Sequence, residues 1–191
     1  MSQLTIELSS FSSRSKCKFL NSSSFVKLSE TCAIVGQNGW YDTMNGDLNQ
    51  TSFYMNDWNK IHEFRGKSIH EIIRLSKSLA QVAADSIKRD VQLAVSQGFK
   101  EIVIATHVPP FVECCFHKGK KTDAGTLPWY SSGLMGNALA DVASENRDVD
   151  FKVFCGHTHS PSSVQIFENM NVSVSRAEYG HPSYNVVNTS K

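Results

Sequence analysis

Three histidines follow two short apolar stretches of the sequence, where their side chains can bind a metal ion. His107 follows the run 101–106, and His157 and His159 follow the run 151–155 after a single glycine. A short apolar run is typical of a buried strand, and a glycine after it permits the sharp turn that aims both imidazoles beyond the strand end. Imidazole nitrogens suit zinc, manganese and iron. A His-x-His pair considered alone is also compatible with a polar surface loop.

The segment between the two apolar runs indicates how the histidines are brought together. Residues 132–146 have the pattern of a helix, so the order along the chain is strand, helix, strand. Such a connection within one sheet places the strands parallel, with their carboxyl ends at one edge, and open α/β sheets bind ligands at that edge. We therefore expect His107, His157 and His159 to converge and to bind a divalent metal.

Short motifs surround these histidines. They are ATHVPPF (105–111), CGHTH (155–159), GWYD (39–42), LPW (127–129) and AEYG (177–180). In combination, the first two resemble the last two signature blocks of the calcineurin-like metallophosphoesterases, and the other three resemble a bacterial branch of that superfamily.

The resemblance implies a fold and an activity. The implied fold is an α/β protein built as a four-layer α/β/β/α sandwich. The implied activity is metal-dependent phosphoester hydrolysis, in which a hydroxide shared by two divalent metals (Mn, Fe or Zn) attacks phosphorus. On the same pattern, His107 and His157 would hold one metal and His159 the other.

Motifs that the superfamily places earlier in its domain are missing from this sequence. No Asp-x-His or Asn-His occurs, and Gly46-Asp47 lacks the second aspartate of the Gly-Asp-x-x-Asp pattern. We therefore interpret residues 30–182 as the carboxyl-terminal part of the domain, with its amino-terminal half missing. Residues 1–29 are interpreted as a serine-rich arm or edge strands, and 183–191 as a polar tail.

These missing motifs leave two functional hypotheses. In the first, the chain is an incomplete metallophosphoesterase; no catalytic residue can be assigned in it, and we expect little activity of its own. The alternative is a non-catalytic metal-binding or structural module that uses the same three histidines.

Two further residues are candidates for contact with the site or its substrate. Asp42 follows a predicted strand at 31–35, where it either orients a metal-binding imidazole, touches substrate, or is a solvated loop residue. Lys118 lies in a basic cluster with Lys120 and Lys121, which either contributes a partner for a phosphate oxygen or is a solvated run of charge.

The composition is that of an ordinary globular protein and indicates no macromolecular partner. Of 191 residues, 40% are hydrophobic, and 19 basic residues nearly balance 18 acidic ones. Without a basic face or a long apolar stretch, the sequence argues against nucleic-acid binding and membrane insertion. The five irregularly spaced cysteines argue against a disulfide framework, and no leader pattern is present, so a cytoplasmic location is expected. The oligomeric state is left open.

The remaining elements are predicted from periodicity and turn residues. Ser68 and Glu71 form a capping-box pattern at the start of a long helix, which Gly98 terminates. Further predicted elements are a strand at 31–35, a short helix within 53–64, and a hairpin with strands at 163–167 and 172–174.

Overall fold

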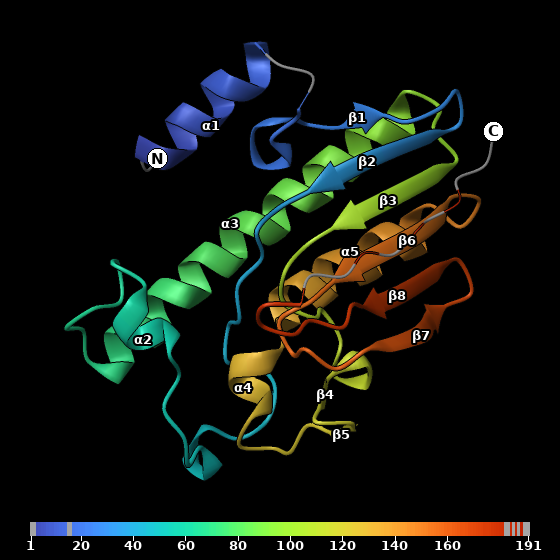
Figure 1. Cartoon of the computed structure of the whole chain (residues 1–191). Helices are drawn as coiled ribbons and strands as arrows, with labels where there is room; N and C mark the ends of the chain where they lie inside the picture. The colour runs from blue at the N-terminus through green and yellow to red at the C-terminus, as the bar shows by residue number, and fades with distance from the viewer. Residues whose placement is uncertain (1–2, 15–16, 182–183, 185, 187, 189–191) are drawn as a thin grey trace.

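The fold is organised around one mixed sheet. A computed structural model describes residues 3–14, 17–181, 184, 186 and 188. The strands of the sheet are β1 (Val26–Lys27), β2 (Cys32–Gly36), β3 (Glu101–Ala105), β6 (Asp150–Cys155), β7 (Ser162–Phe167) and β8 (Met170–Val174). Their order is β1-β2-β3-β6-β8-β7 (Figure 1). The neighbours β2, β3, β6 and β8 are parallel, and β1 and β7 pair antiparallel at the two edges.

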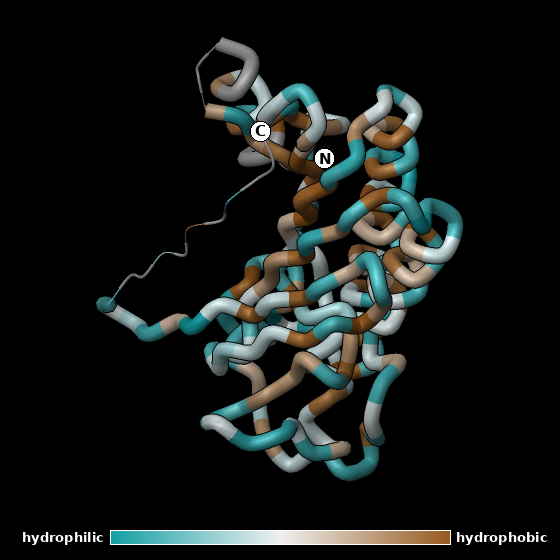
Figure 2. The backbone as a smooth tube through the Cα atoms, turned by 90° about the vertical axis from the view of Figure 1, so that its right-hand side faces the viewer, coloured by the Kyte–Doolittle hydropathy of each residue, from teal (hydrophilic) through white to brown (hydrophobic). Residues whose placement is uncertain are grey.

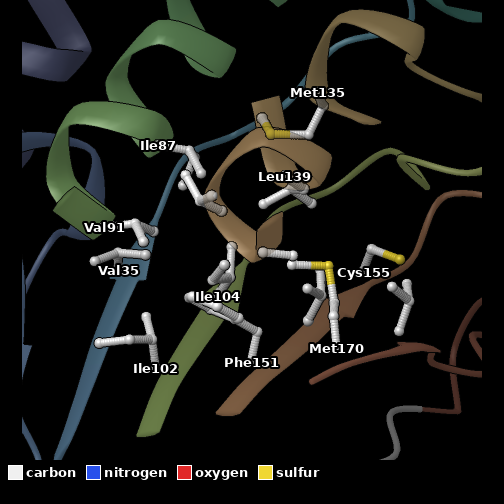
Figure 3. Packing of buried hydrophobic residues seen from close by; sticks show 14 of the residues in the cluster. Val35, Ile87, Val91, Ile102, Ile104, Met135, Leu139, Phe151, Cys155 and Met170 are labelled. Carbon is white, nitrogen blue, oxygen red and sulfur yellow. The ribbon is translucent and has the colours of Figure 1, made fainter. Parts of the chain in front are cut away.

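Two helices, α3 (Ile69–Ser96) and α5 (Gly133–Glu145), cover one face of this sheet (Figure 1). They contact each other, and apolar side chains from both helices meet those of the strands. Figure 3 shows this core with labelled side chains from four parallel strands and both helices: Val35, Ile87, Val91, Ile102, Ile104, Met135, Leu139, Phe151, Cys155 and Met170. Their removal from water is the main contribution to stability. Figure 2 shows the corresponding pattern, with hydrophobic residues along the strands and polar residues in many outer loops.

The ends of both helices agree with the sequence. The backbone nitrogen of Ser68 donates to Glu71 at 2.8 Å and its hydroxyl accepts from the Glu71 backbone at 3.4 Å, which is the predicted capping box. Gly98, just after α3, has φ +91°, a conformation that favours glycine. The helix α5 begins after Ser132, whose hydroxyl accepts from the Met135 backbone at 3.3 Å.

The opposite face of the sheet carries charged and polar side chains. Lys152 donates to Glu101 at 2.7 Å, and its ammonium also reaches the backbone oxygen of Asn188 at 3.4 Å.

The described elements confirm the α/β class, with one large sheet and with α3 and α5 on the same face of it. The four-layer arrangement and the missing half stay predictions.

Shorter elements complete the chain: α1 (Gln3–Arg14), η1 (Leu20–Ser22), η2 (Leu48–Gln50), α2 (Asp57–Lys60), η3 (Val112–Cys114), β4 (Phe116–His117), β5 (Lys120–Lys121) and α4 (Leu127–Tyr130). Most of the helical pattern predicted within 53–64 is irregular or turn, because only α2 is helical there. Within the described residues, no helix has both the length and the apolar character needed to cross a bilayer.

The interpretation of residues 1–29 as an arm or edge strands needs correction. Only β1 is an edge strand, whereas Gln3–Arg14 forms the helix α1 (Figure 1). The sequence is ambiguous here, because Leu4, Ile6 and Leu8 alternate as in a strand while Leu4, Leu8 and Phe11 have helical spacing. Of the predicted polar tail, only residues 184, 186 and 188 lie within the described part of the chain.

Candidate metal centre

Two of the three predicted histidines meet at the carboxyl edge of the sheet. The strands β3 and β6 are adjacent and parallel, with Ala105 opposite Phe154, so the loops that follow them are neighbours. Nδ1 of His157 lies 3.2 Å from Nε2 of His107, and the two rings cross nearly at right angles, at 78°. The predicted convergence is therefore confirmed for this pair.

The ring of His157 is fixed by a backbone carbonyl. Its Nε2 lies 2.9 Å from the oxygen of Trp129, and because a carbonyl can only accept, Nε2 carries the proton. In the neutral ring, Nδ1 then presents a lone pair towards His107. A metal-binding histidine commonly donates its second ring N–H to a carbonyl or carboxylate in this way.

The separation of the two ring nitrogens fits a shared metal ion. Ligand nitrogens about 2.0–2.1 Å from one ion, at tetrahedral or octahedral angles, lie roughly 2.8–3.4 Å from each other. The observed 3.2 Å between His107 and His157 falls within that range. The distance between the two ring nitrogens is therefore compatible with both acting as ligands of one divalent cation.

The backbone of the histidine loop is unusual. His157 has φ +64° and His159 has φ +58°, the left-handed region that residues other than glycine seldom adopt. The loop is held by its neighbour, since the Gly156 nitrogen donates to the His107 oxygen at 2.9 Å. Such strain persists only where the surrounding structure imposes it, and it is concentrated at functional sites.

The surrounding protein lowers the pKa of both imidazoles of the pair. Desolvation by burial, together with a smaller contribution from His107, lowers the pKa of His157 to about 4. The side chain of His107 faces a pocket. Desolvation by the surrounding protein also lowers its pKa, and the carboxylate of Asp57 opposes this shift. Metals bind the neutral imidazole, so near pH 7 neither ring has to lose a proton first.

The third predicted ligand, His159, does not join the pair. Its exposed ring packs edge-on against Tyr179, with the ring centres 5.3 Å apart. Its charge lowers the pKa of both His107 and His157, so it lies near them. Within the described residues, however, no three His, Cys, Asp or Glu side chains are grouped to hold one metal ion. The expectation of three converging rings is thus correct for two of them.

Asp42 caps a helix. The carboxylate is buried and accepts hydrogen bonds from the Ser132 hydroxyl at 3.0 Å and from three backbone nitrogens: Met44 at 3.0 Å, Gly133 at 3.1 Å and Leu134 at 2.6 Å. These contacts join the loop after β2 to the amino terminus of α5, where the helix dipole favours a negative charge. The predicted contact with an imidazole or a substrate stays a prediction, and the solvated alternative is wrong.

Lys118 lies at the tip of a small hairpin beside the histidine loop. Lys118 and Gly119 connect β4 to β5 with φ +50° and +75°, as in the tight two-residue turns of hairpins. The Gly119 nitrogen donates to the Ser160 hydroxyl at 3.4 Å, which ties the hairpin to the loop that carries His159. The exposed side chain of Lys118 therefore lies on the same side of the molecule as the histidine loop. Its contact with phosphate stays a prediction.

Two residues near the pair, Tyr130 and Asp57, are not predicted from the sequence. The ring of Tyr130 lies 5.4 Å from that of His157, and Asp57 lines the same pocket as both histidines. This pocket has a volume of about 610 Å³. Neither residue belongs to a recognisable motif, because their places depend on how α2 and α4 pack on the sheet edge. Only proximity to the LPW motif could have drawn attention to Tyr130.

Fold and site together define an α/β protein with two neutral imidazoles facing each other at the carboxyl edge of a parallel sheet. A scan against protein-family models finds no match, and a search of the curated proteins finds no significant similarity. The geometry of His107 and His157 is consequently the main basis for a functional conclusion.

Proposed function

We propose that this protein is a metal-dependent phosphoester hydrolase in which His107 and His157 hold a divalent metal. The observation that carries the proposal is the 3.2 Å approach of their ring nitrogens, with the other nitrogen of His157 bound to the Trp129 carbonyl. When bound, a divalent metal would polarise the phosphoryl oxygen and supply a nucleophile at neutral pH. The similarity of segments 105–111 and 155–159 to metallophosphoesterase motifs supports the same activity.

The residues of the chain would orient ligands and substrate. The Trp129 carbonyl prevents rotation of the His157 ring, and the Tyr130 ring packs against the same imidazole. The adjoining pocket leaves space for the organic part of a phosphoester. In this proposal His159 contributes to a second metal, the ions are Mn, Fe or Zn, the sheet is part of a four-layer sandwich, and the protein acts in the cytoplasm.

Hydrolysis of bis-p-nitrophenyl phosphate and p-nitrophenyl phosphate with Mn²⁺ tests the activity. Turnover is expected to be slow, so the ratio between variants is the measurement. His107→Ala and His157→Ala should each lower the rate at least about 100-fold, because each removes a metal ligand. His70→Ala, an exposed histidine on α3, is the matched control and should keep the wild-type rate. Turnover that needs no metal, or that survives both substitutions, would contradict the proposal.

A second candidate is a binding module without turnover. It is favoured by one observation, namely that the described residues supply two ligands to one ion and no grouped third. Stoichiometric Mn²⁺ binding that depends on His107 and His157, with no hydrolysis of either substrate, would establish this module in place of the enzyme.

A further inference from the structure

We propose that the pocket beside His107 binds an organic ammonium group, so that the substrate is a phosphoester of an amino alcohol. The inference deepens the proposed function and rests on it for the phosphoester, but not for binding of the ammonium group. The pocket is lined by residues from η1, from the loop after β2, from α2 and from the ends of β3 and β6. They include Phe19, Trp40, Tyr41, Asp57, His107 and His157.

The pocket is lined by an acidic side chain. Among the described lining residues, Asp57 is the one that carries a carboxylate. No lysine or arginine is found among these described residues, so the pocket offers no cationic side chain of its own to additional phosphate groups. A nucleoside polyphosphate is therefore disfavoured, and a cation is favoured.

The carboxylate of Asp57 has no cation to pair with. The ion pairs found in the described part of the chain do not include it. It is half-buried, and this burial raises its pKa above the ordinary value, although attraction to His107 opposes the shift. A half-buried carboxylate without a cationic partner is unfavourable, and a bound cation would reduce that cost.

The pocket is also lined by aromatic rings, including those of Trp40 and Phe19. Trp40 is half-buried and is held edge-on by Phe64, with ring centres 5.5 Å apart, and by Tyr41, at 6.2 Å. Indole and phenyl rings attract ammonium groups through their electron-rich faces, and aromatic residues with a carboxylate are a common way to recognise a quaternary ammonium ion. The lining thus supplies both components for a cationic group.

Binding of choline to the metal-free protein tests this inference. The probe is compared with 3,3-dimethylbutan-1-ol, its neutral isostere, in the presence of EDTA, and both Kd values are measured by saturation-transfer NMR. Choline should bind at least about tenfold more tightly than the isostere, because only choline interacts with the charge of Asp57 and with the ring faces. Equal affinities, or no binding of either compound, would overturn the proposal.

Substitutions locate the binding site. Asp57→Asn should remove the preference for choline, and Asp85→Asn, which changes an exposed carboxylate on α3, should preserve it. The melting temperature of Asp57→Asn at pH 7 should not fall, since the substitution removes an unpaired half-buried charge. A retained preference in the folded Asp57→Asn variant would also overturn the proposal.

These results are separable from those of the hydrolase test, because they need neither metal nor turnover. If choline binds through Asp57 but Mn²⁺-dependent hydrolysis is absent, the hydrolase proposal fails and the ammonium site stands. If hydrolysis depends on His157 but choline does not bind, only the ammonium site fails.

Discussion

The core beneath α3 and α5 differs from the carboxyl edge of the sheet in how well local backbone preferences agree with the fold. In the core, periodic apolar residues such as Ile87, Leu139 and Phe151 are fully buried, and helix caps, strand pattern and packing agree. At the edge, His157 and His159 adopt left-handed backbone conformations. Agreement among all levels of structure is what specifies a fold, and local departures from it are typical of functional sites.

Unpaired polar groups show the same contrast. Within the described residues, the buried hydroxyls of Thr106 and Thr158, both at the edge, have no hydrogen-bond partner. Buried polar atoms without partners are costly, and the core under the helices is formed instead by apolar side chains. The core therefore supplies most of the stability, and the edge holds polar groups and backbone conformations that reduce it.

The largest effect expected from this contrast is the loss of a core side chain. Leu139→Ala should lower the free energy of unfolding by about 3–5 kcal/mol, because the fully buried leucine on α5 leaves a cavity. Urea unfolding measures the change. Val82→Ala is the control, since Val82 is 63% exposed on α3 and its loss should change stability by roughly 0.5 kcal/mol or less. Similar losses for the two variants would remove the distinction between core and surface.

A smaller effect should come from protonation at the edge. The pKa of His157 is lowered to about 4 in the folded protein from an ordinary 6.5. As the pH falls from about 6.5 towards 4, the unfolded chain binds a proton that the folded chain does not, so stability falls. Between pH 7 and pH 5, the metal-free protein should lose about 1–2 kcal/mol through this group.

His157→Gln isolates that contribution. Urea unfolding of both proteins at pH 7, 6 and 5 in EDTA should show a shallower decline for the variant, because glutamine does not titrate. The difference between the two curves is the quantity of interest, since carboxylates titrate in both proteins. Parallel curves would mean that burial of the His157 imidazole does not disfavour its protonation.

The sequence predicts much of the fold because the relevant signals are local. The apolar runs before His107 and His157 are strands, the Ser68 capping box begins α3, and the hairpin turn near Asn169 joins β7 to β8. Each signal needs only neighbouring residues. The helix α1 was not predicted, because its apolar residues fit two periodicities and its burial could not be known from the sequence.

The site was only partly predictable because its contacts are distant in sequence. The partner of Asp42 is Ser132, 90 residues further along the chain, so its capping role has no local signal. The isolated Asp57 likewise reaches the pocket only through the packing of α2. Strand order does place His107 beside His157, but it does not fix the direction of the ring of His159.

The proposed function requires that the imidazoles of His107 and His157 bind one divalent ion. Titration of the metal-free protein with Co²⁺, followed by its visible absorption, measures this binding. The account predicts saturable binding that weakens at least about tenfold in His107→Ala and in His157→Ala, because each loses a nitrogen ligand, and that is unchanged in His70→Ala. No binding by the wild-type protein, or equal binding by all four proteins, would contradict it.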